Sequence, residues 1–155
     1  MIIEREITVN KTIEDAWIVL GKDFDKLHIW ASPVKYCKPN DNKSLNGSPC
    51  IERICKIRGM PTNYEKLFEF SNQTYSLSYT IKGIPKVLVK NARNNWRLYT
   101  ISSNVTQLTM KMELESNGFF GRLMQPILKI ILAKLFETVL KDFKFYAEGF
   151  GSNNQ

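Results

Sequence analysis

A chain of 155 residues, 43% hydrophobic and 24% charged, suits one domain with its own core and leaves little room for two. Charged residues at positions 4–6 exclude a signal peptide, and no stretch reaches the roughly 18 uncharged residues of a membrane span, so we expect a cytoplasmic protein. The net charge of +7 suits an acidic protein or an anionic membrane surface; nucleic acid is not expected as a partner, because no nucleic-acid-binding motif is present.

The first part of the chain is predicted to fold as a strand, a helix and one further helical turn. Residues 2–9 alternate between apolar and polar side chains, which is typical of a β-strand. Residues 11–24 have helical periodicity, with Thr12 as the N-cap. The further turn, within residues 25–34, should end before Pro33, because a proline disfavours helical geometry in the residue before it.

Residues 38–49 are rich in turn-forming residues and are predicted to be a loop or hairpin. The three cysteines, Cys37, Cys50 and Cys55, match no metal-binding spacing and are interpreted as small buried thiols. The chain has one histidine, His28, which is too few for a histidine-based metal site. We therefore expect no metal and no cofactor.

Residues 50–115 change to a period of two, which indicates antiparallel strands with one buried face. In residues 62–70, the alternation is interpreted as placing Tyr64 and Phe68 on the inner face and Glu65 on the other. Residues 107–114 have the clearest pattern, and Met110 is expected to point at the C-terminal helix from the middle of that strand. Turn formers between the strands predict a meander.

The last part of the chain, residues 120–148, returns to helical periodicity. Charges recur within every two turns, so the helix is not expected to cross a bilayer, and its apolar stripe should pack on the sheet. The predicted stripe contains Leu123, Ile127, Ile131, Leu135 and Val139, broadened by Met124, Leu128 and Phe143. Residues 151–155 are interpreted as a loose tail after a single domain of residues 1–150.

Five segments are informative when taken together: "ITVNKTIEDAWIVLGKDFDKLHIW", "NGSPCIER", "YEKLFEFSNQTYSLSYTIKG", "NNWRLYTISSNVTQLTM" and "GFFGRLMQPILKIILAKLFETVLKDFKFYAEG". Together they resemble the helix-grip fold of the START-like, or SRPBCC, superfamily. The superfamily includes polyketide cyclases/dehydrases, lipid-transfer domains and the birch-pollen-allergen family. The resemblance implies an α+β fold in which a curved antiparallel sheet wraps around a long C-terminal helix, with two short helices after the first strand.

The resemblance also implies an apolar cavity between the sheet and the C-terminal helix, which binds a small hydrophobic molecule such as a lipid, polyketide or aromatic compound. An alternative is a cyclase or dehydratase that acts in the same cavity. A second alternative is an interaction module that uses the basic strip from Lys82 to Arg97. The candidate lining residues are Arg53, Cys55, Phe68, Tyr75, Leu77, Tyr79, Trp96, Leu108, Met110, Met112, Met124, Ile127, Leu128 and Ile131. Each of them has the alternative of simply filling the core.

Arg53 is the most informative polar position, because it lies on a strand face that the pattern buries. It either pairs with Glu65 or Glu69, or it holds a carboxylate or carbonyl group of a ligand; if the alternation is off by one residue, the face is solvated instead. The acid/base candidates are Glu65, Lys66, Glu69, Tyr79 and His28. Asn94 could give a ligand one hydrogen bond, or could stabilise a nearby turn.

Overall fold

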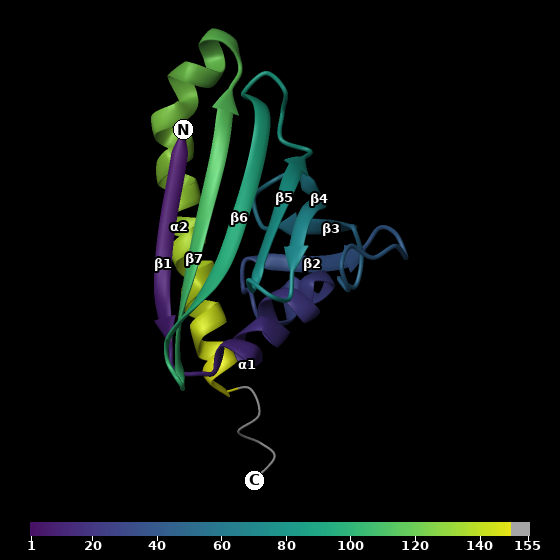
Figure 1. Cartoon of the computed structure of the whole chain (residues 1–155). Helices are drawn as coiled ribbons and strands as arrows, with labels where there is room; N and C mark the ends of the chain where they lie inside the picture. The colour runs from purple at the N-terminus through teal and green to yellow at the C-terminus, as the bar shows by residue number, and fades with distance from the viewer. Residues whose placement is uncertain (150–155) are drawn as a thin grey trace.

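The computed structural model describes residues 1–149, and within them seven antiparallel strands form one sheet in the order β1-β7-β6-β5-β4-β3-β2 (Figure 1). The elements are β1 (Ile2–Val9), α1 (Ile13–Trp17), η1 (Ile18–Lys22), η2 (Phe24–Ile29), β2 (Val34–Pro39), β3 (Glu52–Ile57), β4 (Thr62–Ser71), β5 (Ser76–Lys82), β6 (Val89–Ser102), β7 (Val105–Ser116) and α2 (Gly118–Gly149). This is the expected α+β arrangement. The expected tail, residues 151–155, lies outside the described residues.

The long helix α2 runs along β1 and β7 on one side of the sheet (Figure 1). Polar contacts attach it to β1: Arg5 Nε lies 3.4 Å from Glu137 Oε1, and Lys144 Nζ donates to the carbonyl oxygen of Thr8 at 2.7 Å. Apolar side chains from both layers form one hydrophobic core between them.

The N-terminal helical region begins as predicted but is not one continuous helix. Thr12 caps α1, because its Oγ1 accepts a hydrogen bond from the backbone N–H of Asp15 at 3.2 Å. The helix then widens into the π-helical turn η1, where the ring of Trp17 lies against Gly21 so closely that a Cβ there would meet it at 2.5 Å. A 3₁₀ segment, η2, follows, and its residue Phe24 is buried in the core.

Strand β2 was not predicted: the expected helical turn ended before Pro33, residues 34–37 were assigned to no element, and the last two residues of the strand were assigned to a loop. It is an edge strand in which only Val34 and Cys37 are buried, so it lacks regular alternation. Cys37 faces Cys55 across the β2–β3 pair, and the two form a disulfide. The expectation of buried thiols is therefore wrong for these two cysteines and correct for Cys50, which is buried and free.

Strand β4 contains an irregularity that reverses the predicted faces of its first half. The pairing with β5 shifts between Leu67 and Glu69, so Phe68 turns outward and is 51% exposed. Before the shift, Glu65 and Leu67 point inward, and Tyr64 is exposed. The placement of Tyr64 and Phe68 on the inner face is wrong for this reason.

The inner face of α2 also differs from the predicted stripe. Among the predicted residues, Val139 and Phe143 are buried, whereas Leu123, Ile127 and Ile131 are exposed. The buried positions on the helix are Gly121, Leu132, Phe136, Val139, Leu140, Phe143 and Ala147. No helix in residues 1–149 has both the length and the apolar character needed to span a membrane.

The rotation of α2 is set where its first turns touch the segment between β5 and β6. A Cβ on Gly121 would lie 2.3 Å from the carbonyl oxygen of Leu88, so only glycine allows this approach. The backbone N–H of Asn117 donates to the same oxygen at 3.0 Å. Because Gly121 faces this segment, the residues close to a whole number of turns later, Leu128 and Leu132, lie on the same side of the helix.

Candidate ligand-binding cavity

A cavity of about 290 Å³ lies between the inner face of the sheet, η2 and α2. Its volume is close to the lower end of the range for small-molecule sites, roughly 300–1,000 Å³. Most of the wall is apolar. It is lined by Leu27, Val34, Ile57, Gly59, Met60, Pro61, Asn63, Glu65, Tyr79, Ile81, Ile84, Pro85, Leu88, Val89, Asn94, Trp96, Met112, Leu114, Leu128, Ile131, Leu132, Leu135, Phe136 and Val139.

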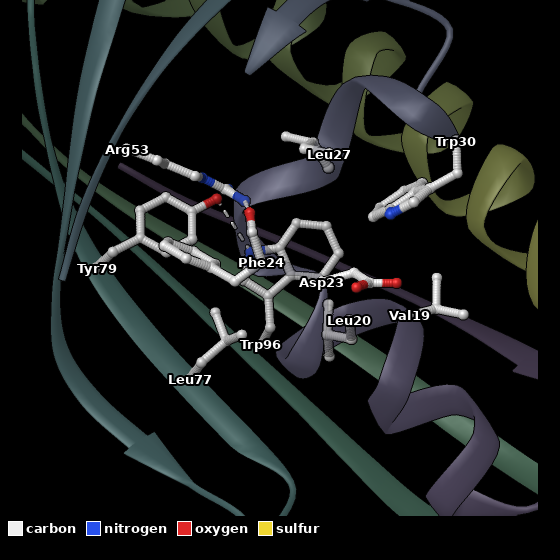
Figure 2. A pocket seen from close by; sticks show the side chains of 10 residues that line it. All are labelled: Val19, Leu20, Asp23, Phe24, Leu27, Trp30, Arg53, Leu77, Tyr79 and Trp96. Carbon is white, nitrogen blue, oxygen red and sulfur yellow. Dashed lines mark hydrogen bonds between the residues drawn. The ribbon is translucent and has the colours of Figure 1, made fainter. Parts of the chain in front are cut away.

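Five of the predicted lining residues do line this cavity: Tyr79, Trp96, Met112, Leu128 and Ile131. A smaller void of about 10 Å³, with room for about one water molecule, shares Leu27, Tyr79 and Trp96 with the wall of this cavity. Two further predicted residues, Arg53 and Leu77, line that void together with Phe24 and Leu27 (Figure 2).

The other seven predicted residues lie elsewhere. Cys55, Leu108 and Met110 are buried in the packed core and do not line the cavity, so the alternative of core filling holds for them. Tyr75 packs edge-on against Trp17, with ring centroids 6.0 Å apart. The last three, which are at least partly exposed and also absent from the lining, are Phe68, Met124 and Ile127.

Tyr79 provides a hydrogen-bond donor in the cavity wall. Its hydroxyl oxygen accepts hydrogen bonds from Asn94 Nδ2 at 3.1 Å and from Trp96 Nε1 at 3.2 Å, and Figure 2 shows the bond from Trp96. The proton of this hydroxyl has no acceptor among residues 1–149. Burial, and secondarily the charge of Glu65, raises the pKa of Tyr79, so the hydroxyl stays protonated.

Two acceptors lie in the same part of the wall. Asn94 is 3% exposed, and its Oδ1 is buried with no hydrogen-bond partner in the described residues. Glu65 is equally buried, and its Oε2 takes both hydrogen bonds from Arg53 while Oε1 accepts none among residues 1–149. Since a buried polar atom without a partner costs about 1–3 kcal/mol, Asn94 Oδ1 marks a place where a polar ligand atom would stabilise the structure.

Arg53 is the ion-pair partner of Glu65. Its Nε and Nη2 lie 2.7 and 2.6 Å from Glu65 Oε2, and its Nη1 donates to the carbonyl oxygen of Phe24. The guanidinium lies over the Phe24 ring at 3.8 Å and beside the Tyr79 ring at 5.2 Å (Figure 2). The attraction of Glu65 keeps the pKa of Arg53 raised in spite of burial. The pairing alternative from the sequence is therefore observed, with Glu65 and not Glu69.

The remaining polar candidates lie outside the cavity. Glu69 accepts hydrogen bonds from Ser76 and Ser78 at 3.3 and 3.0 Å. His28 Nδ1 accepts the backbone N–H of Cys37 at 3.2 Å, which joins η2 to β2. Lys66 is exposed and does not line the cavity. Within residues 1–149, no group of three His, Cys, Asp or Glu side chains converges on a metal position.

Sequence reasoning missed the cavity residues that come from loops and irregular positions. Gly59, Met60 and Pro61 form the β3–β4 turn, and Ile84 and Pro85 lie between β5 and β6, where no periodicity exists to predict an inward side. On the strands a usable signal did exist. The alternation of β5 already placed Ile81 on the side of Tyr79, and the alternation of β7 placed Leu114 on the side of Met112.

Comparisons with known proteins agree with this arrangement. Residues 1–148 match the family described as polyketide cyclase / dehydrase and lipid transport. No functionally curated protein matches the sequence significantly. Among solved structures, the chain is similar to the Zhui aromatase/cyclase from Streptomyces sp. R1128, with a TM-score of 0.79 and 13% identity over 96% of this chain and 94% of that one.

Two further structures widen the range of relatives. A START superfamily protein from Mycobacterium smegmatis has a TM-score of 0.76 and 11% identity, over 95% of this chain and 97% of that one. The protein Ara h 8.0201 has a TM-score of 0.68 and 12% identity, over the same shares of the two chains. At these identities, the likeness establishes the helix-grip fold alone.

Proposed function

The chain belongs to the polyketide cyclase / dehydrase and lipid transport family, and on that premise we propose that it binds a small hydrophobic ligand with one hydroxyl-bearing end in the cavity between the sheet and α2. The family implies hydrophobic ligand binding or cyclase chemistry. The cavity supports the first of these, because its wall is mostly apolar and its volume suits a guest of one or two rings or a short acyl chain.

The observation that carries the proposal is the pairing of a free donor with a free acceptor at one place in an apolar wall. The Tyr79 hydroxyl can donate, and Asn94 Oδ1 can accept. An alcohol or a phenol does both at a single oxygen. A guest with such a group would satisfy two buried atoms at once, whereas a pure hydrocarbon would leave both without partners.

The test compares two aromatic probes of similar size, 2-naphthol and 2-methylnaphthalene, in titrations with the purified chain. Asn94→Leu should weaken 2-naphthol binding about five- to tenfold, the value of one hydrogen bond near 1 kcal/mol, and leave 2-methylnaphthalene binding unchanged. Asn95→Leu is the matched control, because Asn95 is the next residue on β6 and does not line the cavity. Equal weakening of both probes by Asn94→Leu would contradict the proposed polar end.

A second candidate, a cyclase or dehydratase, is favoured by the position of Glu65 beside Tyr79 in the same wall. Glu65 Oε1 could remove a proton alpha to a ketone, and the Tyr79 O–H could stabilise the resulting enolate oxygen. The enolate carbon would attack a second carbonyl carbon of the same molecule, which closes the ring, and the resulting alkoxide would take the proton from Glu65. Loss of this hydroxyl group with a further alpha proton, as water, would form the C=C bond. This candidate ranks second, because Glu65 is already engaged by Arg53.

Incubation with a synthetic poly-β-ketone distinguishes the two candidates. An enzyme would convert it to a product lighter by one water molecule, and Glu65→Gln would abolish the conversion while 2-naphthol still binds. No conversion by a chain that binds 2-naphthol would leave ligand binding as the function.

A further inference from the structure

The first half of α2, residues 118–131, presents bulky apolar side chains to solvent. Six of them are between 47% and 77% exposed: Phe119, Phe120, Leu123, Ile127, Ile130 and Ile131. The remainder of the helix has one comparably exposed large apolar side chain, Phe145. A contiguous apolar surface of this kind on a monomer marks an interaction site more often than chance exposure does.

Residues 119–131 contain only three polar side chains, namely Arg122, Gln125 and Lys129. Their spacing of three and four residues places them in one narrow strip along the helix. A helix with a broad apolar face and a basic polar strip is the type that lies in the plane of a membrane surface.

Three chain segments that supply much of the cavity lining carry positive charge and no negative charge. Residues 54–64, 81–90 and 116–136 contain no Asp or Glu. Their cations are Lys56, Arg58, Lys82, Lys86, Lys90, Arg122, Lys129 and Lys134. Lys90 is paired with Glu115, at 3.0 Å. The surface therefore complements a negatively charged partner.

The exposed face of α2 and the cavity share an edge. Ile131 belongs to both, being 47% exposed and part of the cavity lining. Asn117, just before α2, holds the loop between β5 and β6 against the helix, since its Nδ2 donates to the carbonyl oxygen of Lys86 at 2.7 Å. Figure 1 shows the first turns of α2 and this loop at the same end of the molecule.

From this juxtaposition we propose that the first half of α2, with the two loops beside it, docks on an anionic lipid bilayer. The apolar side chains enter the boundary between headgroups and acyl chains, and the cations meet the phosphates and carboxylates of the headgroups. The cavity mouth then faces the bilayer. The next step rests on the proposed function: an apolar ligand passes between the membrane and the cavity with little exposure to water.

Charge and composition favour the bilayer over the other occupants of such a face. In a symmetric dimer through this surface, the same patch of both copies would meet, which would bring the cations of one copy against those of the other. An acidic protein would neutralise the cations but would have to supply a matching apolar surface for two adjacent phenylalanines and four aliphatic side chains. A bilayer provides both the negative charge and the apolar environment, and it does not need a surface of complementary shape.

The test is flotation of the full chain with vesicles. Vesicles of phosphatidylcholine and phosphatidylserine, at roughly 3:1, should carry the protein, and pure phosphatidylcholine should carry much less. The double variant Phe119→Ser/Phe120→Ser should lower the partition coefficient at least about tenfold, because two exposed rings are removed from the inserted face. Arg122→Glu should weaken binding to the anionic vesicles and, through lost charge attraction, reduce its dependence on salt.

Two controls on α2 match these changes in type but lie in its second half. Phe145→Ser removes an even more exposed ring, and Lys141→Glu makes the same charge change, so both should leave flotation unchanged. The proposal is overturned if folded protein fails to float with anionic vesicles, or if the controls weaken flotation as much as the test variants do. Binding to polyglutamate without binding to vesicles would overturn it in favour of an acidic protein partner.

Uptake of 2-naphthol in the absence of vesicles separates this proposal from the proposed function. Phe119→Ser/Phe120→Ser should bind the probe normally, because neither ring lines the cavity. Normal uptake without flotation would contradict the docking proposal and leave the proposed function unaffected. Flotation without uptake would leave the docking surface and remove the ligand-binding function.

Discussion

The buried pair of Arg53 and Glu65 shows which properties of a single residue, its burial and its partner, can be predicted from the sequence. The alternation of β3 correctly placed Arg53 inward, and a buried guanidinium requires a partner. The choice of Glu65 over Glu69 was not predictable, because the irregularity at Phe68 changes which of them faces inward. A bulge leaves no periodic signal in a stretch as short as β4.

At this scale we predict that Arg53 acts mainly as the neutralising partner of Glu65. Arg53→Met should lower the free energy of unfolding by about 3–5 kcal/mol, because it leaves a buried carboxylate unpaired. The double variant Arg53→Met/Glu65→Leu should recover most of that loss. Urea denaturation of the three proteins measures both effects.

The exposed pair of Lys111 and Glu113 provides the control, since both side chains are more than 40% exposed. Lys111→Met should leave the urea midpoint unchanged. If the double variant at Arg53 and Glu65 is no more stable than Arg53→Met alone, the guanidinium stabilises the fold through Phe24 and Tyr79, and the prediction is wrong.

At the scale of elements, the strands were easier to predict than the orientation of the last helix. Polar residues mark the outer face of β7, whereas residues 119–131 are apolar almost all round the helix. Periodicity cannot choose an inner face when nearly every face qualifies. The choice comes from the close approach of Gly121 to Leu88, a tertiary contact that has no signature in the pattern.

Two neighbouring aliphatic residues on α2 test this orientation. Leu132→Ala should destabilise the protein by about 2–5 kcal/mol, because Leu132 is 8% exposed and packs in the core. Ile130→Ala should change stability by no more than about 0.5 kcal/mol, because Ile130 is largely exposed. Thermal and urea unfolding give both values. Comparable losses would mean that the Ile130 side of α2 also packs in the core, which would contradict the described orientation of the helix.

At the scale of the whole molecule, the order of elements was sufficient to predict the fold, and the resemblance it suggested is confirmed by the family match over residues 1–148. The position of the cavity was not predictable to the same degree. It depends on where the sheet and α2 diverge, and Met110 and Met112 show the consequence. They share one strand face, yet only Met112 lines the cavity.

These two methionines provide the last prediction. Met110 is 1% exposed, opposite Trp96 on β6, and an indole there has no free space, so Met110→Trp should cost about 1–3 kcal/mol by overpacking. Met112→Trp makes the same substitution two residues along β7, where the indole can enter the cavity of about 290 Å³. Its stability should stay within about 0.5 kcal/mol of the wild type.

Uptake of 2-methylnaphthalene gives the second readout of this pair. Met112→Trp should lose most of the uptake, because the indole occupies the volume that the probe needs, while Met110→Trp should retain it in the fraction that remains folded. The reverse result would place the free space beside Met110, as the strand pattern alone suggested. Equal destabilisation by both variants, with no uptake by the wild type, would mean that the interior is packed and that the chain acts through its surface, where the exposed half of α2 is the remaining candidate.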